Sequence, residues 1–314
     1  MAQNEAPIIL DETEQKIIDI IDAHRDQIID FAKDIYTHAE LGYKEFRTAE
    51  KFANFMKALG LPTKEHLAVT GVKAYLNEEK KDNVSLALIG ELDALRIPEH
   101  KYANPETQGA HCCGHHAQLA GVIGAAIALT NPEVKEKLDG QVVLFAVPAE
   151  EYGEIEFKNK LTDEGKIKYG SGKCELIRIG AFDDIDLDIV HHIGDKDISG
   201  GSTDVGDVQH IQPVLTFNTG GKVSGLHSVD FDIVDDELAY VVTAKIFALS
   251  AYRLLKNDAE KAKEVVENYH PIFTKDAYIQ YMNSFISVEG GSPTEINAPR
   301  GCAMILYGIC QRKS

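Results

Sequence analysis

The run Gln141–Val147 (QVVLFAV) constrains the fold most, because it is apolar, rich in β-branched residues and has the length of a buried strand. It ends at Pro148, which marks the end of the strand. Other short apolar segments of strand character lie at residues 69–76, 85–88, 188–190 and 214–217.

Apolar residues at helical spacing separate these segments and predict five helices, at residues 13–36, 48–59, 117–129, 237–255 and 261–269. Asp235 or Asp236 is expected to cap the fourth of them. Strands that alternate with helices predict an α/β protein. We therefore expect a three-layer α/β/α sandwich around a largely parallel, mixed central sheet.

The bulk composition excludes several partners. The 314-residue chain has 50 acidic and 32 basic residues, for a net charge of −18 at pH 7. An acidic surface repels nucleic acid and anionic membranes, so we expect neither as a partner. No stretch of about 18 consecutive apolar residues occurs, which argues against a transmembrane helix.

The number of cysteines and the composition of the N-terminal residues indicate the cellular compartment in which the protein is expected. Five cysteines are an odd and sparse set for this length, which argues against a disulfide framework. Residues 1–16 are acidic and lack the apolar core of a signal peptide. We expect a cytoplasmic protein, with cysteines as metal ligands or core filler. Cys310, in the apolar segment 305–310, is expected in the core.

Two polar segments interrupt the pattern. Residues 153–175 are rich in Lys and Glu, and we expect them to form a solvated excursion. Residues 194–206 contain four glycines and are the most linker-like part of the chain.

The segment 109–118 (GAHCCGHHAQ) concentrates potential metal ligands at the start of a predicted helix. It holds His111, Cys112, Cys113, His115 and His116. Thiolate and imidazole together suit Zn or another late first-row divalent metal. The alternative is a loop with incidental histidines and core cysteines, but five potential ligands in six positions favour a metal site.

Glu150 and Glu151 follow the apolar run directly, at the sheet edge where sites form in open α/β folds. Adjacent carboxylates leaving a buried strand are costly unless they meet cations. Because alternate residues point in different directions, one can bind metal while the other takes a proton from a metal-bound water. The alternative is an exposed pair that begins a loop.

Two further elements are weaker alone: His191–His192 after the candidate strand 188–190, and His227 within residues 225–228. In isolation each is read more readily as an ordinary surface or core histidine.

Taken together, these motifs resemble the M20 metallopeptidase and amidohydrolase family, in the branch with a cysteine ligand. The resemblance runs in order over most of residues 24–255. It rests on six elements, at residues 38–45 (HAELGYKE), 93–97 (DALRI), 111–116 (HCCGHH), 148–151 (PAEE), 202–208 (STDVGDV) and 225–227 (GLH).

The resemblance implies a zinc-peptidase-like catalytic domain that spans residues 1–314 and holds two divalent metal ions, Zn or Mn. Glu150 would be the general base that deprotonates a water, and the substrates would be N-acyl amino acids, small peptides or aminobenzoyl-glutamate-like amides. The ligands would be Cys113, His115, Glu151, His192 and His227. His192 fits the family spacing better than His191, which stays an alternative.

The sequence departs from the family pattern at Ala39, Arg96 and His116, where the family has proline, proline and aspartate. The larger departure is a missing lid. The family inserts a domain that carries dimer contacts between its fourth and fifth ligand regions, and residues 193–202 leave no room for it.

The missing lid leaves two hypotheses open, an amide hydrolase and a metal-binding core that is catalytically weak. A third hypothesis is a structural zinc protein, but the open metal positions that a catalytic carboxylate implies argue against it. The missing lid also makes a monomer plausible, because the family dimer runs through the lid.

Overall fold

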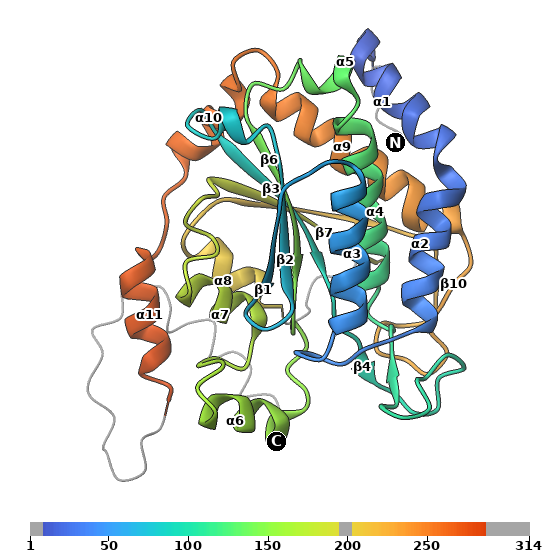
Figure 1. Ribbon diagram of the computed structural model, residues 1–314, viewed down its shortest axis with the longest axis vertical. Helices are drawn as coiled ribbons and strands as arrows, with labels where there is room; N and C mark the ends of the chain where they lie inside the picture. Colours follow the sequence, from blue (N-terminus) through green and yellow to red (C-terminus); the bar gives the residue numbers. More distant parts are fainter. Residues whose placement is uncertain (1–8, 195–202, 287–314) are drawn as a thin grey trace, which may run out of the picture. The chain divides into compact units, whose positions relative to one another are not determined.

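A six-stranded mixed sheet forms the centre of the fold in the computed structural model, which describes residues 9–194 and 203–286 (Figure 1). The strand order is β1-β2-β6-β3-β7-β8. Strands β6, β3, β7 and β8 run parallel, whereas β1 and β2 are antiparallel to their neighbours. The strands are β1 (Thr63–Leu67), β2 (Gly71–Leu76), β3 (Ser85–Glu91), β6 (Gln141–Val147), β7 (Leu187–Ile193) and β8 (Val214–Thr219).

Helices lie on both faces of this sheet, which confirms the predicted α/β sandwich (Figure 1). One face carries α1 (Glu12–Ala23), α2 (Arg25–Thr37), α3 (Phe46–Ala58), α4 (His115–Leu129) and α9 (Val242–Leu255). The other carries α7 (Gly172–Arg178) and α8 (Val205–Gln209), whereas α6 (Ile155–Asp163) lies below the ends of the strands in this view. The remaining elements of this unit are η1 (Glu78–Lys80), α5 (Pro132–Lys135), α10 (Glu260–Asn268), and the short hairpins β4 (Leu95–Arg96) with β5 (Gly109–Ala110) and β9 (Lys222–Val223) with β10 (Asp232–Ile233).

The chain separates into two compact units, residues 1–271 and 272–314. The sheet and its helices belong to the first unit. The described part of the second unit contains α11 (Lys275–Asn283). Phe273, which precedes this helix, stacks on Tyr281 within it.

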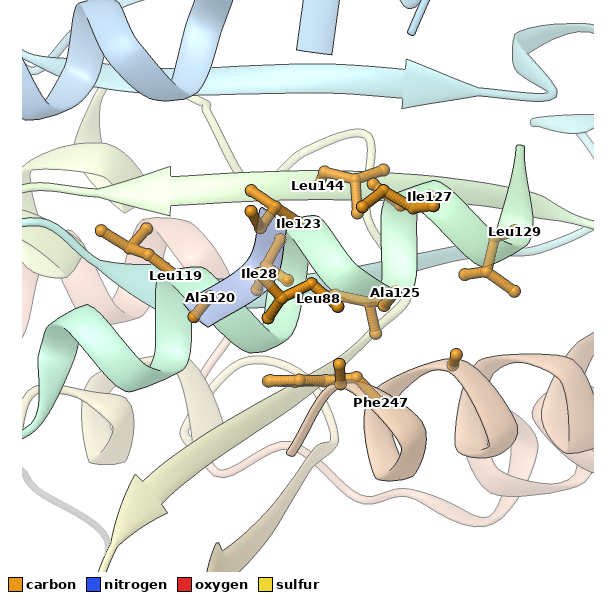
Figure 2. Close-up of a cluster of buried hydrophobic side chains, with 14 of the residues drawn as sticks. Ile28, Leu88, Leu119, Ala120, Ile123, Ala125, Ile127, Leu129, Leu144 and Phe247 are labelled. Atoms are coloured by element: carbon orange, nitrogen blue, oxygen red, sulfur yellow. The ribbon is translucent and has the colours of Figure 1, made fainter. Parts of the chain in front are cut away.

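Helix α4 is the centre of the core, and every one of its residues is buried. Gly121 and Gly124 allow close approach of α9, since a Cβ at either position would lie 2.5 Å from Thr243 or Ala244. Figure 2 shows part of the hydrophobic core around α4, in which α4 side chains lie among Leu88 and Leu144 of the strands and Phe247 of α9. The dense packing fixes the N-terminus of α4, where the predicted ligands lie.

One helical segment, Glu237–Leu255, is long and apolar enough by length and composition to cross a membrane. It comprises the π-helical turn η2 (Glu237–Val241) and α9. Tyr240, Phe247 and Leu255 are fully buried, as expected for the core helix of a globular protein. Asp235, rather than Asp236, caps the segment, because its side chain accepts a hydrogen bond from the amide of Leu238 at 3.0 Å.

Two predictions from the sequence are wrong in detail. The single helix expected over residues 13–36 is two helices that meet at His24, whose φ and ψ of −108° and 14° are not helical. The segment 153–175 is not a solvated excursion throughout, because it forms α6 and begins α7 and buries Lys158, Lys173 and Glu175. Most of the predicted linker, the expected position of the missing lid, and Cys310 lie outside the described residues.

Candidate functional site

Residues from the carboxyl ends of β3, β6 and β7 line a cavity of about 500 Å³ together with the start of α4 and the loop before β10. Among the residues predicted from the sequence, this cavity brings together Cys113, Glu150, Glu151, His192 and His227, and the alternative His191 lines it as well. Parallel strands place their carboxyl ends at one edge of the sheet, which explains why residues more than 100 positions apart meet here.

Gly114 gives the chain its turn into α4. It has a φ of 94°, and a Cβ there would lie 2.1 Å from the side chain of Ile193. Only glycine fits this combination of conformation and contact. Cys113 and His115 therefore flank this turn, at the N-terminus of α4.

Cys113 is the centre of a four-residue cluster. Its Sγ lies 3.3 Å from Nε2 of His192 and 3.2 Å from Nε2 of His227. The same nitrogen of His227 is 3.2 Å from Oε1 of Glu151. His227 is held at this position because its main-chain amide donates to the carbonyl of Cys112 at 2.8 Å.

His115 lies beside this cluster and is completely buried. The carbonyl of Asp93 is 2.8 Å from its Nδ1, which orients the ring. Its Nε2 faces Glu91 at 3.0 Å and Glu150 at 3.8 Å. Burial disfavours the charged ring, but Cys113 and Glu91 outweigh it and raise the pKa of His115 well above its usual value.

The loop after β6 is held from several directions. Ala149 has a φ of 49°, and its amide donates to the buried carboxylate of Glu45 at 2.9 Å. The amide of Glu151 donates to Asp93 at 2.9 Å. Lys158 donates to the carbonyl of Glu151 at 2.7 Å. These bonds fix the backbone on both sides of Glu150.

Glu150 itself is nearly buried beside other carboxylates. Burial, with the charge of Glu91 next in importance, raises its pKa to about 8. A carboxylate whose pKa lies near neutrality is suited to accept and release a proton.

The two adjacent histidines of β7 occupy different environments. His192 contacts Cys113 from the cavity side. His191 is fully buried, its Nε2 lies 2.7 Å from the hydroxyl of Thr219, and its ring packs against Phe217. The geometry therefore places His192, rather than His191, among the candidate ligands.

The three departures from the family pattern lie outside the cluster. His116 is buried in the core and stacks on Tyr36 with ring centroids 4.5 Å apart. Arg96 donates to Gln108 on the short β4–β5 hairpin, and Ala39 is buried.

The residues fit a divalent metal. Three groups of side chains each place their ligand atoms within 4.8 Å of one another: Cys113, His115 and His192; Cys113, Glu151 and His227; and Glu91, His115 and Glu150. Nε2 of His115 and Oε1 of Glu151 are buried and make no hydrogen bond of good geometry among the described residues, although they lie 3.0 Å from Glu91 and 3.2 Å from His227 respectively. Buried imidazole and carboxylate atoms whose hydrogen bonds are left unmade, around a thiol, are the donor set expected for a zinc-like ion.

Sequence reasoning missed Glu91, Lys158 and Lys173, which are buried on β3, α6 and α7. Glu91 lies two residues before Asp93 at the end of a buried strand, a position that could have marked it. The two lysines gave no such signal, because each lies in a segment whose composition resembles a solvated surface.

Known amide hydrolases resemble this chain in sequence. Residues 87–303 match the Peptidase family M20/M25/M40. IAA-amino acid hydrolase ILR1-like 2 of Arabidopsis thaliana is 30% identical over 173 residues, 52% of this chain and 38% of that protein. A p-aminobenzoyl-glutamate hydrolase chain of Escherichia coli is 28% identical over 182 residues, 56% of this chain and 34% of that protein. The chain thus spans little more than a third of the length of these relatives.

A solved structure supports the fold. The Bacillus subtilis YXEP protein, described as a dinuclear metal binding peptidase of the M20 family, superposes with a TM-score of 0.60 at 15% identity. The superposition covers 74% of this chain and 98% of that one. At this identity the likeness concerns the fold alone, whereas the family match covers more than half of the chain: the protein belongs to peptidase family M20/M25/M40.

Proposed function

We propose that this chain hydrolyses amide bonds in small substrates, with two divalent metal ions, Zn or Mn, at the cavity edge. The observation that carries the proposal is the convergence of four side chains beside His115 and Glu150: Cys113 lies within hydrogen-bond distance of His192 and His227, and His227 lies within that distance of Glu151. The relatives named as amide hydrolases support the same reaction class.

Five side chains would hold the metal ions: Cys113, His115, Glu151, His192 and His227. When bound, the ions would lower the pKa of a water and polarise the scissile carbonyl. The orienting contacts are already present, because Asp93 fixes the ring of His115 through its carbonyl and fixes the amide of Glu151 through its carboxylate.

Glu150 would act as the general base. Its position beside His115, with Oε2 3.8 Å from Nε2, places a proton acceptor at the edge of the ligand cluster. It would take a proton from the attacking water as the water oxygen bonds to the carbonyl carbon. It would then deliver a proton to the nitrogen as the C–N bond breaks, so that the products are a carboxylic acid and a free amine.

The lining of the cavity supports the proposed substrate class. Beyond the cluster it is lined by apolar Val190, Val205 and Leu226, and by the neutral polar side chains of Thr216 and Asn218. An acyl group would pack on the apolar wall, which suits N-acyl amino acids, small peptides or aminobenzoyl-glutamate-like amides. The absence of a lid domain, a monomeric state and a cytoplasmic location remain predictions from the sequence.

Metal content and turnover test this proposal together. Purified protein should contain at least one equivalent of Zn or Mn after reloading and release free amino acid from an acyl-amino-acid panel. Chelator should abolish the release, and Glu150→Gln should abolish it while metal stays bound. Less than one equivalent of metal after reloading would refute the site.

Cysteine substitutions supply a matched control for the same site. Cys113→Ser should weaken metal binding, because Sγ is the central atom of the cluster. Cys112→Ala removes the neighbouring thiol, which lies in the apolar core, and should leave metal affinity unchanged. Equal effects of the two substitutions would contradict the assignment of Cys113.

A second candidate function follows from the expectation that the lid is missing, because residues 193–202 leave no room for it in the sequence. A core that binds metal but turns over slowly would give stoichiometric metal without amino-acid release, since substrate positioning and water exclusion would be weak. A structural zinc protein would instead unfold on chelation. A chelation melt beside the activity assay separates the three functions.

A further inference from the structure

Lys173 is a fully buried ammonium that none of the assigned roles uses. It lies in the first turn of α7 and has no solvent exposure. Its Nζ donates to Oε1 of Glu91 and to Oδ1 of Asp204. A charge without solvent is tolerated only where counterions hold it, so the three side chains must stay together.

Glu91 links the Lys173 ammonium to the ligand cluster, because its carboxylate contacts both Lys173 and His115. The second carboxylate oxygen, Oε2, accepts from Nε2 of Gln118 at 2.9 Å and lies 3.0 Å from Nε2 of His115. The main-chain amide of Glu91 also donates to Gln118, at 2.7 Å. Lys173 and Gln118 therefore determine together where the Glu91 carboxylate stands against His115.

Through Asp204 the same ammonium is tied to the cavity wall. Oδ2 of Asp204 accepts from the hydroxyl of Ser171 and from the amide of Lys173, the latter at 2.9 Å. Thr203 and Val205, on either side of Asp204, line the cavity. Glu91 and Asp204 belong to distant parts of the sequence, and among the described residues Lys173 is the cation that joins them.

We propose that Lys173 is a positioning residue, whose ammonium sets the Glu91 carboxylate against His115 and fixes the Asp204 segment beside the cavity, so that the ligand cluster keeps its metal-binding geometry. Within the described part of the chain, its hydrogen bonds reach Glu91 and Asp204 rather than the proposed ligands. This inference rests on the proposed function, since it concerns the metal affinity of that site.

Removing the Lys173 ammonium is expected to change metal affinity in opposite directions, depending on whether its charge or its positioning contacts matter more, and this makes the proposal testable. Removing a nearby positive charge by itself would strengthen the binding of a dication. Loss of the positioning contact would weaken binding, by the roughly 10–100-fold seen when a ligand loses its supporting partner. A weaker-binding variant therefore cannot be explained by charge alone.

Co²⁺ is the probe, because its visible absorption and its thiolate charge-transfer band report on the ligand geometry at Cys113. Lys173→Met should bind Co²⁺ about 10–100-fold more weakly than the wild type and change these bands. The double variant Lys173→Met with Asp204→Asn keeps the net charge and relieves the lone carboxylate, so it guards against misfolding. It should also bind weakly, because Glu91 still lacks its partner.

Lys73→Met is the matched control. Lys73 is also buried, at 2% exposure, and pairs with Asp184 away from the cavity lining. It should lose stability but keep the affinity and spectrum of the wild type. If the wild type and Lys73→Met bind Co²⁺ and both Lys173 variants bind it equally well, the inference falls and the proposed function stands.

The remaining outcomes are also decisive. If the wild type itself binds no Co²⁺, the proposed function falls and takes the inference with it. If neither Lys173 variant folds, as judged by urea unfolding, Lys173 serves the stability of the fold, which also overturns the proposal.

Discussion

The carboxylate of Glu45 accepts a hydrogen bond from the main-chain amide of Ala149 at 2.9 Å, across 104 positions of the sequence. Its other oxygen accepts from the hydroxyl of Thr70 at 2.7 Å. Ala149 has a φ of 49°, which is strained for a residue with a Cβ. The bond from Glu45 therefore holds a strained turn, and this turn aims Glu150 and Glu151 in different directions.

The first prediction concerns this bond. Glu45→Gln keeps the size of the side chain but can turn an amide group, instead of an acceptor, toward Ala149. We expect kcat to fall by on the order of 100-fold, because a displacement of about 1 Å at the base has this effect.

Glu14→Gln is the control for Glu45→Gln. Glu14 is also buried and also accepts from a main-chain amide, that of Asp11 at 3.0 Å, but it belongs to the capping box of α1. It should lower stability and leave kcat unchanged. A Glu45 variant with the kcat of the wild type would show that the turn needs no such support.

The second prediction separates the two histidines of β7. His192→Ala should weaken metal binding by at least 10–100-fold, because His192 contacts Cys113 from the cavity. His191→Ala should keep the metal affinity but lower the free energy of unfolding by roughly 2–5 kcal/mol, since it removes a buried ring. Co²⁺ titration and urea unfolding of both variants measure this, and the reverse pattern would make His191 the ligand.

Much of the fold was predictable from local pattern, and the reason is visible in individual strands. The run at β6 is apolar on both faces because helices cover both, so composition alone identified it. The cluster around Cys113 was predictable for a related reason: its ligand types are rare and closely spaced.

The site residues that the sequence did not reveal share a physical cause: their partners are close in space but far away in the sequence. Lys158 and Lys173 lie among charged residues that suggest solvent, yet carboxylates and carbonyls far away in the sequence make their burial possible. Glu91 is one of 50 acidic residues, and only the three-dimensional contact with His115 distinguishes it. The break at His24 has no proline or glycine to announce it.

The third prediction concerns the pH dependence of stability. Asp188 on β7 is fully buried, and burial raises its pKa to about 7 although Gln212 donates a hydrogen bond to it at 2.7 Å. The folded state thus binds a proton more tightly than the unfolded state. The stability associated with this proton is complete below the unfolded pKa, near 4, and is lost as pH rises through about 7.

Asp188→Asn removes this dependence and keeps the side-chain shape. We expect the variant to gain on the order of a few kcal/mol over the wild type between pH 5 and pH 8, measured by urea unfolding at both values. Asp26→Asn, at a carboxylate that is 92% exposed, should follow the wild type. An equal loss of stability with pH in Asp188→Asn and the wild type would place the titrating group elsewhere.

The fourth prediction concerns the contact between α7 and the turn after β6. The amide of Gly172 donates to the carbonyl of Ala149 at 3.0 Å, and a Cβ on Gly172 would lie 1.6 Å from the carbonyl oxygen of Pro148. Because the atoms that this Cβ would meet, the carbonyl oxygen and carbon of Pro148, belong to the backbone, Gly172→Ala must push α7 away from the turn. We expect lower stability together with weaker Co²⁺ binding, since Lys173 and the turn move with it.

Gly153→Ala is the control for Gly172→Ala, because nothing lies within 4 Å of a Cβ at Gly153 and the change there should stay within about 0.5 kcal/mol. Urea unfolding and Co²⁺ titration of the two variants, side by side, decide the outcome. If Gly172→Ala loses stability but binds Co²⁺ as the wild type does, α7 supports the fold alone. If it loses both, the segment whose composition suggested a solvated excursion is part of the structure that holds the metal site.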